Sequence, residues 1–293
     1  MSSALVLAQR GSAVVAWRDV LVLLKLRIGL LITTTAVAAA VAAGQRGGLT
    51  LVVLAAAALV SSCGASALNH WLDRDLDARM TRTRSRPVPA GRLSPGVALG
   101  LGLGLSSLPI PAAEILGPGA TLYLLAGGAT YAVVYTAWLK RRTPFSIVWG
   151  GAAGSFAALA GWQTAASTLS PAPLLLAGVL FLWTPCHFWS FAIAHDDDYR
   201  DAGVPTLVAL VGVARAGRAV AASTAGLVAW SLVLGLLLPW PYLAVAAPAG
   251  TWFLLLALRL ARDPTRERAW SLFKLSGLYL LFVLAGLVAA GLA

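Results

Sequence analysis

The sequence from 49 to 77 decides the fold class. It reads LTLVVLAAAALVSSCGASAL at 49–68 and continues directly as NHWLDRDLD at 69–77. The first part is uncharged and has about the 20 residues that a helix needs to cross the hydrocarbon core of a bilayer. In the second part Asn69, Asp73 and Asp77 are four residues apart, so their side chains form one row on a helix. We therefore predict a membrane-spanning helix that ends in oxygen-bearing side chains.

The composition of the chain indicates that this helix is one of several. Of the 293 residues, 59% are hydrophobic and 11% are charged, whereas a soluble domain has about 25% charged residues. We predict an all-α polytopic membrane protein that forms one domain over residues 1–293. A cytoplasmic segment is expected at 1–19, without a cleavable signal. Nine transmembrane helices are predicted near 26–43, 49–70, 95–113, 119–138, 145–164, 172–194, 218–238, 241–260 and 270–291.

The basic residues predict the orientation of these helices. Of the 22 Lys and Arg residues, 21 lie in the N-terminal segment or in alternate loops, and only Arg46 lies on the other side. The positive-inside rule makes that side cytoplasmic and, with nine spans, places the N-terminus inside and the C-terminus outside. This topology accounts for the net charge of +11. We therefore expect the lipid bilayer as a partner and do not expect nucleic acid.

The acidic residues form two clusters, after the second and the sixth predicted span. The clusters are Asp73, Asp75 and Asp77, and Asp196, Asp197, Asp198 and Asp201. Neighbouring carboxylates favour a cation, and Mg²⁺ takes oxygen ligands, commonly one or two carboxylates together with substrate phosphates. Each cluster alone could instead be a solvated helix end that arginines neutralise. Asp75 points about 200° away from Asp73 on a helix, so the predicted metal ligands are Asn69, Asp73, Asp77, Asp197 and Asp198.

Basic residues beside the acidic clusters predict a diphosphate site. Arginine suits bidentate contacts with phosphate; Arg82 and Arg86 follow the first cluster, and Lys140 ends the fourth predicted span. We predict that these three residues and Asn69 bind the diphosphate. Topology sufficiently explains other basic residues, namely Arg92, Arg141, Arg262 and Arg266. Metal and cations would stabilise the charge on a departing diphosphate, and an allylic diphosphate would leave a delocalised carbocation.

His187 is a further unusual polar residue, in WTPCHFW at 183–189 near the end of the sixth predicted span. An ionisable group inside a membrane is a functional candidate, and His187 could ligate a heme, accept a proton or make a structural hydrogen bond. Trp189 and Tyr199 are aromatic residues that could shield a carbocation and stabilise it. Cys63 and Cys186 are too few for a disulfide framework or a zinc ribbon, and we interpret them as apolar filling residues.

Together these motifs resemble those of UbiA-type intramembrane prenyltransferases. The first signature is the row from Asn69 to Asp77, continued by MTRTRSRPVPAG at 80–91. The sequence is more narrowly similar to the heme O synthase (protoheme IX farnesyltransferase) branch. That narrowing rests on YTAWLKRRTP at 135–144, TPCHFW at 184–189 and DDYRDAGVP at 197–205.

The resemblance implies nine helices around a central cavity and a magnesium-assisted transfer of the farnesyl group from farnesyl diphosphate to a vinyl group of heme B, which gives heme O and diphosphate. It implies catalytic roles for Asp73, Asp77, Asp198 and His187. It also implies that the heme acceptor binds beside His187, Trp189 and Tyr199. A downstream heme-modifying enzyme is a further candidate partner. The expected location is the plasma membrane of a prokaryote, with the active site on the cytoplasmic side. Cys186 and Lys25-Leu26 depart from this pattern, which usually has a proline in place of Cys186 and Lys-Pro near the first helix.

Two other functions remain open at this point. One is prenylation of an aromatic, quinone or chlorophyll-type acceptor. The other is an ion-coupled transporter, which would favour acidic residues near the bilayer midplane, often in broken helices. Both acidic clusters are instead predicted at one face of the membrane, beside arginines, as a diphosphate headgroup requires.

Overall fold

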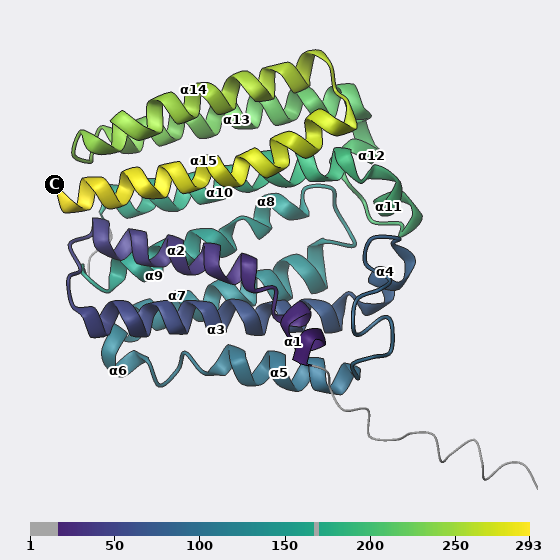
Figure 1. Ribbon diagram of the computed structural model, residues 1–293, viewed down its shortest axis with the longest axis horizontal. Helices are drawn as coiled ribbons and strands as arrows, with labels where there is room; N and C mark the ends of the chain where they lie inside the picture. The colour runs from purple at the N-terminus through teal and green to yellow at the C-terminus, as the bar shows by residue number, and fades with distance from the viewer. Residues whose placement is uncertain (1–16, 167–169) are drawn as a thin grey trace, which may run out of the picture.

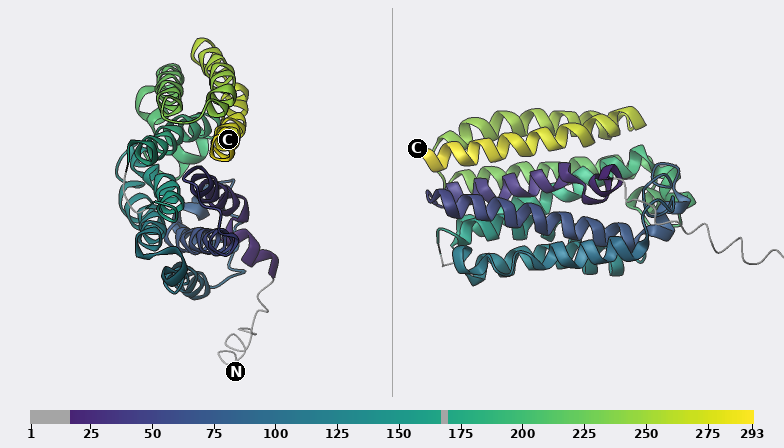
Figure 2. Two further views of the ribbon diagram at one scale, coloured as in Figure 1. Left: turned by 90° about the vertical axis from the view of Figure 1, so that its left-hand side faces the viewer. Right: turned by 60° about the horizontal axis from the view of Figure 1, so that its bottom comes forward.

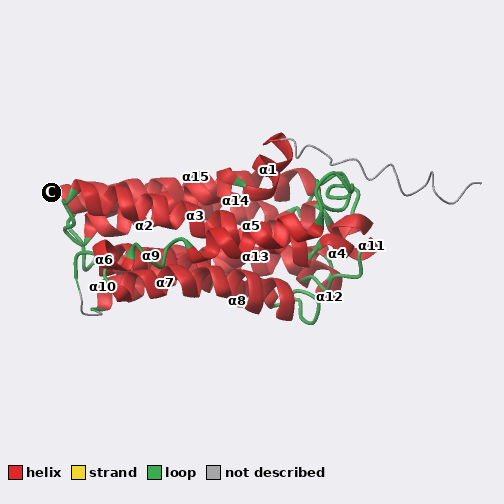
Figure 3. Ribbon diagram, turned by 90° about the horizontal axis from the view of Figure 1, so that it is seen from below, coloured by secondary structure: helices red, strands yellow, loops and turns green. Residues whose placement is uncertain are grey.

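The apolar segments fold as long helices that run side by side along the molecule (Figure 1). The structure is a computed structural model and describes residues 17–166 and 170–293. Within these ranges every regular element is helical and no strand occurs (Figure 3), so the predicted all-α fold is confirmed. The elements are α1 (Trp17–Leu24), α2 (Leu26–Ala42), α3 (Gly48–Leu72), α4 (Arg74–Arg79), α5 (Pro95–Ser107), α6 (Ala113–Leu116), α7 (Pro118–Ala129), the π-helix η1 (Thr130–Leu139), α8 (Ser146–Gly150), α9 (Ala152–Gln163), α10 (Pro171–Ala194), α11 (Asp196–Asp201), α12 (Leu207–Val211), α13 (Val213–Gly235), α14 (Pro241–Arg262) and α15 (Arg266–Leu292).

Several of these helices can cross a membrane. Within the described residues six are long and apolar enough: α3, the continuous helix formed by α7 and η1, α10, α13, α14 and α15. The pair α1 and α2, bent by 45°, would make a seventh. The apolar α5 is shorter; it ends at Ser107, shortly before two prolines that cannot continue a helix. A turn at Gly151 separates α8 from α9.

Small residues allow the helices to pack closely, as is typical of membrane bundles. A Cβ atom at Gly161 of α9 would overlap the backbone of Ala36 in α2. One at Gly64 of α3 would lie 2.5 Å from the backbone nitrogen of Ser106 in α5. Larger side chains at these glycines would therefore separate α2 from α9 and α3 from α5.

The long helices follow a curve when the molecule is seen along their length (Figure 2). α2 contacts α3, α9 and α15, while α10 contacts α9, α13 and α15. The largest apolar core lies among α10, α13, α14 and α15 and contains the fully buried Tyr242, Phe253 and Tyr279. The N-terminal and C-terminal halves of the chain are thus joined through α2, α9, α10 and α15.

Both acidic segments lie at the same end of the bundle. The short helices α4, α11 and α12 gather there with the loop from 80 to 93 (Figure 1). Met80 and Leu93 of this loop are 2% and 1% exposed, which fixes the loop against the helices. Thr81 donates its backbone N–H to the Asp198 carboxylate at 3.1 Å. The connection after α3 is therefore in direct contact with the connection after α10.

Candidate active site

A cavity of about 350 Å³ opens at this end of the bundle. Its polar side comes from the end of α3 and the following loop, and its aromatic side comes from η1, α10, α11 and α15. Sequence segments nearly 250 residues apart thus contribute to one space. The lining residues are Lys25, Ile28, Asn69, Asp73, Asp77, Met80, Arg82, Arg86, Tyr131, Tyr135, Lys140, Ile147, His187, Phe188, Phe191, Tyr199 and Phe273.

The row of Asn69, Asp73 and Asp77 lies on the polar side of the cavity. Although α3 ends at Leu72, the backbone continues its helical path, because Asp73 N–H donates to the Asn69 carbonyl and Asp77 N–H donates to the Asp73 carbonyl. The three residues are 3%, 1% and 2% exposed. The Asn69 amide nitrogen donates to an Asp73 carboxylate oxygen at 2.7 Å and to Thr136 Oγ1 at 3.1 Å. The spacing of four residues therefore places all three side chains on one buried face.

Each acidic member of this row is paired with a cation. Lys140 Nζ lies 2.5 Å from Asp73 Oδ2. Arg86 forms a two-pronged contact with Asp77, at 2.9 and 2.7 Å to its two oxygens. Carboxylates that are taken out of water need such partners, because an unpaired buried charge is strongly destabilising. The structure thus brings together the predicted residues Asn69, Asp73, Asp77, Arg86 and Lys140.

Lys25 is a cavity residue that the sequence interpretation missed. It lies between α1 and α2, and its Nζ donates to Asn69 Oδ1 at 2.6 Å. Its φ is 45°, which makes it the one residue other than glycine with positive φ in the described chain. This conformation is uncommon for such residues and marks functional or strained positions. The available signal is a lysine directly between Leu24 and Leu26, which the sequence prediction assigns to membrane topology.

The π-helix η1 supplies an aromatic wall beside the acidic row. Tyr131 and Tyr135 of η1 line the cavity with ring centroids 5.8 Å apart. Lys140 follows directly, and its backbone N–H donates to the Tyr135 carbonyl at 2.8 Å. A π-helix turns more slowly than an α-helix and is frequently found at functional sites. Tyr131 and Tyr135 are four residues apart and would share a face of an α-helix as well, but Lys140 lies five residues after Tyr135 and reaches the same cavity through the wider turn.

The second acidic cluster is divided by the geometry of α11. Asp198 is 16% exposed, and Arg82 Nε lies 3.8 Å from its carboxylate. Arg82 also lines the cavity and lies over the Phe191 ring at 4.9 Å. Asp197 is instead 68% exposed and pairs with Arg266 at 2.8 Å. The structure therefore connects Asp198 to the site through Arg82 and does not bring Asp197 to the cavity.

Asp75 of the first cluster points away from the site, as its position on the helix predicts. Its carboxylate accepts hydrogen bonds from Arg141 at 2.6 and 2.7 Å. The Arg141 hydrogen bonds lower the pKa of Asp75 to about 2. Asp75 and Arg141 are 50% and 38% exposed, so this pair belongs to the surface.

On the acceptor side, His187 and Tyr199 line the cavity, whereas Trp189 packs in the apolar core. Burial raises the pKa of the Tyr199 hydroxyl to about 12, which keeps it neutral. His187 lies between the Trp183 and Phe273 rings, with centroid distances of 4.2 and 4.4 Å. Phe273 comes from α15, and no motif near His187 indicated its contribution.

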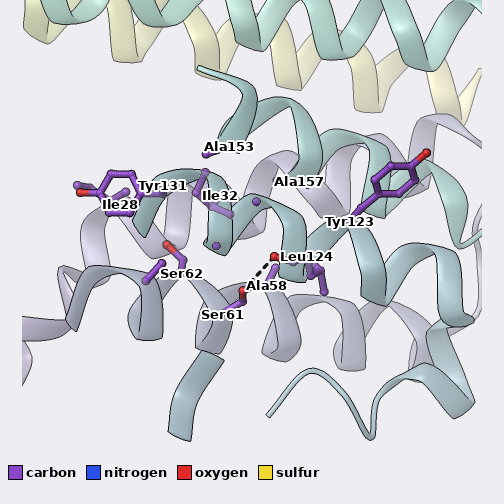
Figure 4. Close-up of a pocket in the computed structure, with 13 residues that line it drawn as sticks. Ile28, Ile32, Ala58, Ser61, Ser62, Tyr123, Leu124, Tyr131, Ala153 and Ala157 are labelled. Carbon is purple, nitrogen blue, oxygen red and sulfur yellow. Dashed lines mark hydrogen bonds between the residues drawn. The ribbon is translucent and has the colours of Figure 1, made fainter. Parts of the chain in front are cut away.

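A small apolar chamber of about 90 Å³ adjoins this cavity (Figure 4). Ile28 and Tyr131 line both spaces. Further in, the walls are small or apolar side chains from α2, α3, α7 and α9, and Tyr123 lies at the far side from Tyr131 in Figure 4. The single dashed bond in that view joins Ser61 Oγ to the Leu124 carbonyl at 3.3 Å. The polar cavity therefore has a neighbouring space with a largely apolar lining.

A sequence model of the UbiA prenyltransferase family matches residues 30–289. The chain belongs to the UbiA prenyltransferase family. The resemblance that the motifs carry is thereby confirmed, and the protein is an integral membrane protein with several apolar spans. The family match covers the cavity, the apolar chamber and both acidic clusters, with the exception of Lys25 and Ile28.

Named relatives support the narrower branch that the motifs predicted. Protoheme IX farnesyltransferase 2 of Paramagnetospirillum magneticum is 42% identical over 78% of this chain and 81% of its own. Protoheme IX farnesyltransferase 1 of Cenarchaeum symbiosum is 38% identical over 77% of each. The fold is similar to that of a UbiA homologue from Archaeoglobus fulgidus bound to GPP and Mg²⁺, with a TM-score of 0.71 and 16% identity over 92% of this chain and 99% of that one.

The acidic row of this UbiA family member also fits a metal ion. Asp73 Oδ1 is buried and has no hydrogen-bond partner among the described residues, so one carboxylate oxygen is available as a ligand. Asp77 and Asn69 add further oxygens on the same face. No three His, Cys, Asp or Glu side chains in the described ranges lie close enough to hold a metal by themselves. The set therefore suits Mg²⁺, which completes its shell with water and substrate phosphates.

Proposed function

We propose that this protein transfers the farnesyl group of farnesyl diphosphate to a vinyl group of heme B, giving heme O and diphosphate. The observation that carries the proposal is a single cavity with a cation-paired acidic row on one side and His187 with aromatic rings on the other. An apolar chamber adjoins that cavity. The names of the relatives support the same substrates.

The diphosphate would bind between the acidic row and the surrounding cations. Asn69, Asp73 and Asp77 would hold Mg²⁺, which supplies Lewis-acid stabilisation of the leaving group when bound. Lys140 and Arg86 are already within hydrogen-bonding distance of the row. Arg82 joins the cavity to Asp198, and Lys25 adds a fourth positive side chain beside Asn69. Because these groups are fixed before the reaction, they stabilise the diphosphate charge that develops as the bond from carbon C1 to oxygen breaks.

The farnesyl carbocation formed in that step must meet the acceptor before it meets water. The chamber beyond Ile28 and Tyr131 would receive only part of the apolar chain, away from the open end of the cavity. The rings of Tyr131 and Tyr135 lie at the entrance and attract a cation through their faces. The vinyl group of heme B then forms a bond to C1, the resulting cation adds water, and a proton is lost to solvent.

We infer that the complete bundle has nine spans, with the bent pair of α1 and α2, α5, and the pair of α8 and α9 each crossing the membrane. The basic loops support a cytoplasmic position for the acidic end and the N-terminus, and an external C-terminus. The protein would then lie in the plasma membrane of a prokaryote and receive both substrates from the cytoplasmic side. Transfer of heme O to a heme-modifying enzyme would follow directly.

The test is turnover by the purified full chain in lipid nanodiscs with heme B, farnesyl diphosphate and MgCl₂, analysed by mass spectrometry. Heme O and diphosphate in equal amounts are expected, with loss of product when EDTA replaces the metal. The same preparation is offered an aromatic acid and a quinone precursor as acceptors. Prenylation of one of these without any heme O would contradict the proposal.

A further inference from the structure

The surroundings of His187 leave one part of its ring available. The Trp183 and Phe273 rings cover its two faces at centroid distances of 4.2 and 4.4 Å. Its Nδ1 lies 2.6 Å from Ser276 Oγ of α15. The edge that carries Nε2 has no hydrogen bond among the described residues, and His187 lines the cavity. The imidazole can therefore act on a ligand only through this edge.

The hydrogen bonds around Ser276 determine which nitrogen carries the proton. The Ser276 hydroxyl donates to the Phe273 carbonyl at 2.7 Å, and a hydroxyl has one proton to donate. Both contacts are satisfied together when Ser276 Oγ accepts from His187, which makes Nδ1 the protonated nitrogen and leaves Nε2 with a free lone pair. The bond from Trp183 Nε1 to the Ser276 carbonyl at 2.9 Å ties the same segment of α15 to α10. The contacts of Ser276 thus set both the orientation of the His187 ring and its tautomer.

We propose that His187 Nε2 coordinates the iron of the acceptor heme and that Ser276 is the positioning residue that prepares it. A neutral imidazole binds iron through an in-plane lone pair, which is the group left free here. Histidines that bind metals commonly donate their other N–H to a fixed acceptor, which sets ring orientation and increases ligand basicity. Because Trp183 and Phe273 cover the faces of the imidazole, it cannot stack on the porphyrin. Coordination would hold the heme plane across the cavity, at a constant distance from the acidic row.

This inference rests on the proposed function only in naming heme as the acceptor. Its test is a binding measurement with ferric heme B and the detergent-purified full chain, without farnesyl diphosphate. The wild-type protein should give the optical and electron paramagnetic resonance spectra of histidine-ligated heme. His187→Ala should lose that signature, and added imidazole should restore it. Ser276→Ala should weaken heme affinity by about 10- to 100-fold, the usual effect of removing such a support, and Ser276→Thr should restore it.

Ser190→Ala is the matched control, because Ser190 is a buried serine of α10 whose hydroxyl donates to the Cys186 carbonyl at 2.7 Å instead of contacting the histidine. It should leave the heme spectrum and affinity unchanged. An unchanged heme spectrum in His187→Ala would overturn the inference, and if turnover were lost in the same variant, a proton-accepting role would replace it. Turnover of the wild-type protein is measured separately. A histidine-ligated spectrum without heme O formation would contradict the proposed reaction and leave the coordination intact.

Discussion

The two acidic clusters have similar composition, but their carboxylates differ in burial and in ion pairing. In the first, Asp73 and Asp77 are almost completely buried and paired with Lys140 and Arg86. In the second, Asp198 lies beside Arg82 and Asp197 faces solvent, while the buried Asp196 pairs with Arg200 and does not line the cavity. Charge interactions are much stronger away from water. Burial at the cavity wall, and not the number of carboxylates, therefore indicates where the chemistry takes place.

The largest expected effect comes from the buried cluster. Asp73→Asn should lower the rate of heme O formation by about 10³-fold, in the range found when a group that stabilises developing charge is removed. The substitution keeps the shape of the side chain, so the helix bundle should remain folded. Rates are measured under saturating substrates, with circular dichroism and gel filtration as controls for folding. Retention of more than a tenth of the wild-type rate would remove Asp73 from the proposed metal site.

Asp198→Asn should have an intermediate effect. Asp198 contacts the site indirectly, through Arg82 and the Thr81 backbone, so we expect a loss of about tenfold in kcat/KM for farnesyl diphosphate. Arg82→Gln should cause a similar loss, and the double variant should be little worse than either single variant because the two residues act together. Fully additive losses would show that the two residues act independently.

Asp75 tests the exposed part of the first cluster. The lowered pKa of about 2 in the folded protein, against an ordinary value of 3.8, means that the carboxylate favours the folded state above about pH 4. That contribution should be lost as the pH falls from about 4 to about 2, and it should be small because the pair is exposed. We expect Asp75→Asn to melt at a slightly lower temperature at pH 7 and at the wild-type temperature at pH 2. If the variant and the wild-type protein melted at equal temperatures at both pH 7 and pH 2, this expectation would be contradicted.

The smallest effect is expected for Asp197→Asn. Its ion pair with Arg266 is exposed on both sides, and such pairs contribute about 0 to 1 kcal/mol. Turnover should change by less than about twofold, since Asp197 does not reach the cavity. Asp73→Asn in the same assay is the matched comparison. A large loss in Asp197→Asn would show that substrate binding reorganises α11 and would abolish the distinction between the two clusters.

The sequence predicted the buried row well because its geometry is local. A spacing of four residues places Asn69, Asp73 and Asp77 on one helical face, and the same periodicity turns Asp75 away. The sequence could not show which of Asp197 and Asp198 faces the site. Successive residues on a helix differ by about 100°, and which of them faces the site depends on how α11 docks against Arg82 and Arg266.

Other members of the site depend on features that leave weak traces in the sequence. Lys25 reaches Asn69 because the chain adopts a left-handed conformation between α1 and α2. Tyr131 and Lys140 share a cavity because η1 is a π-helix, whose wider turn changes the side-chain register. Neither conformation follows from hydropathy, so Lys25 was attributed to topology and Tyr131 was not predicted.

The sequence by itself determined the all-α membrane fold, the row from Asn69 to Asp77 and the family of the protein. These follow from composition, helical periodicity and motifs that are continuous in the chain. The tertiary structure alone decided which cations pair with that row, which acidic residues of α11 are excluded, and that Ser276 and Phe273 of α15 surround His187. The physical reason is that these contacts join helices far apart in the sequence, and their register is set by packing.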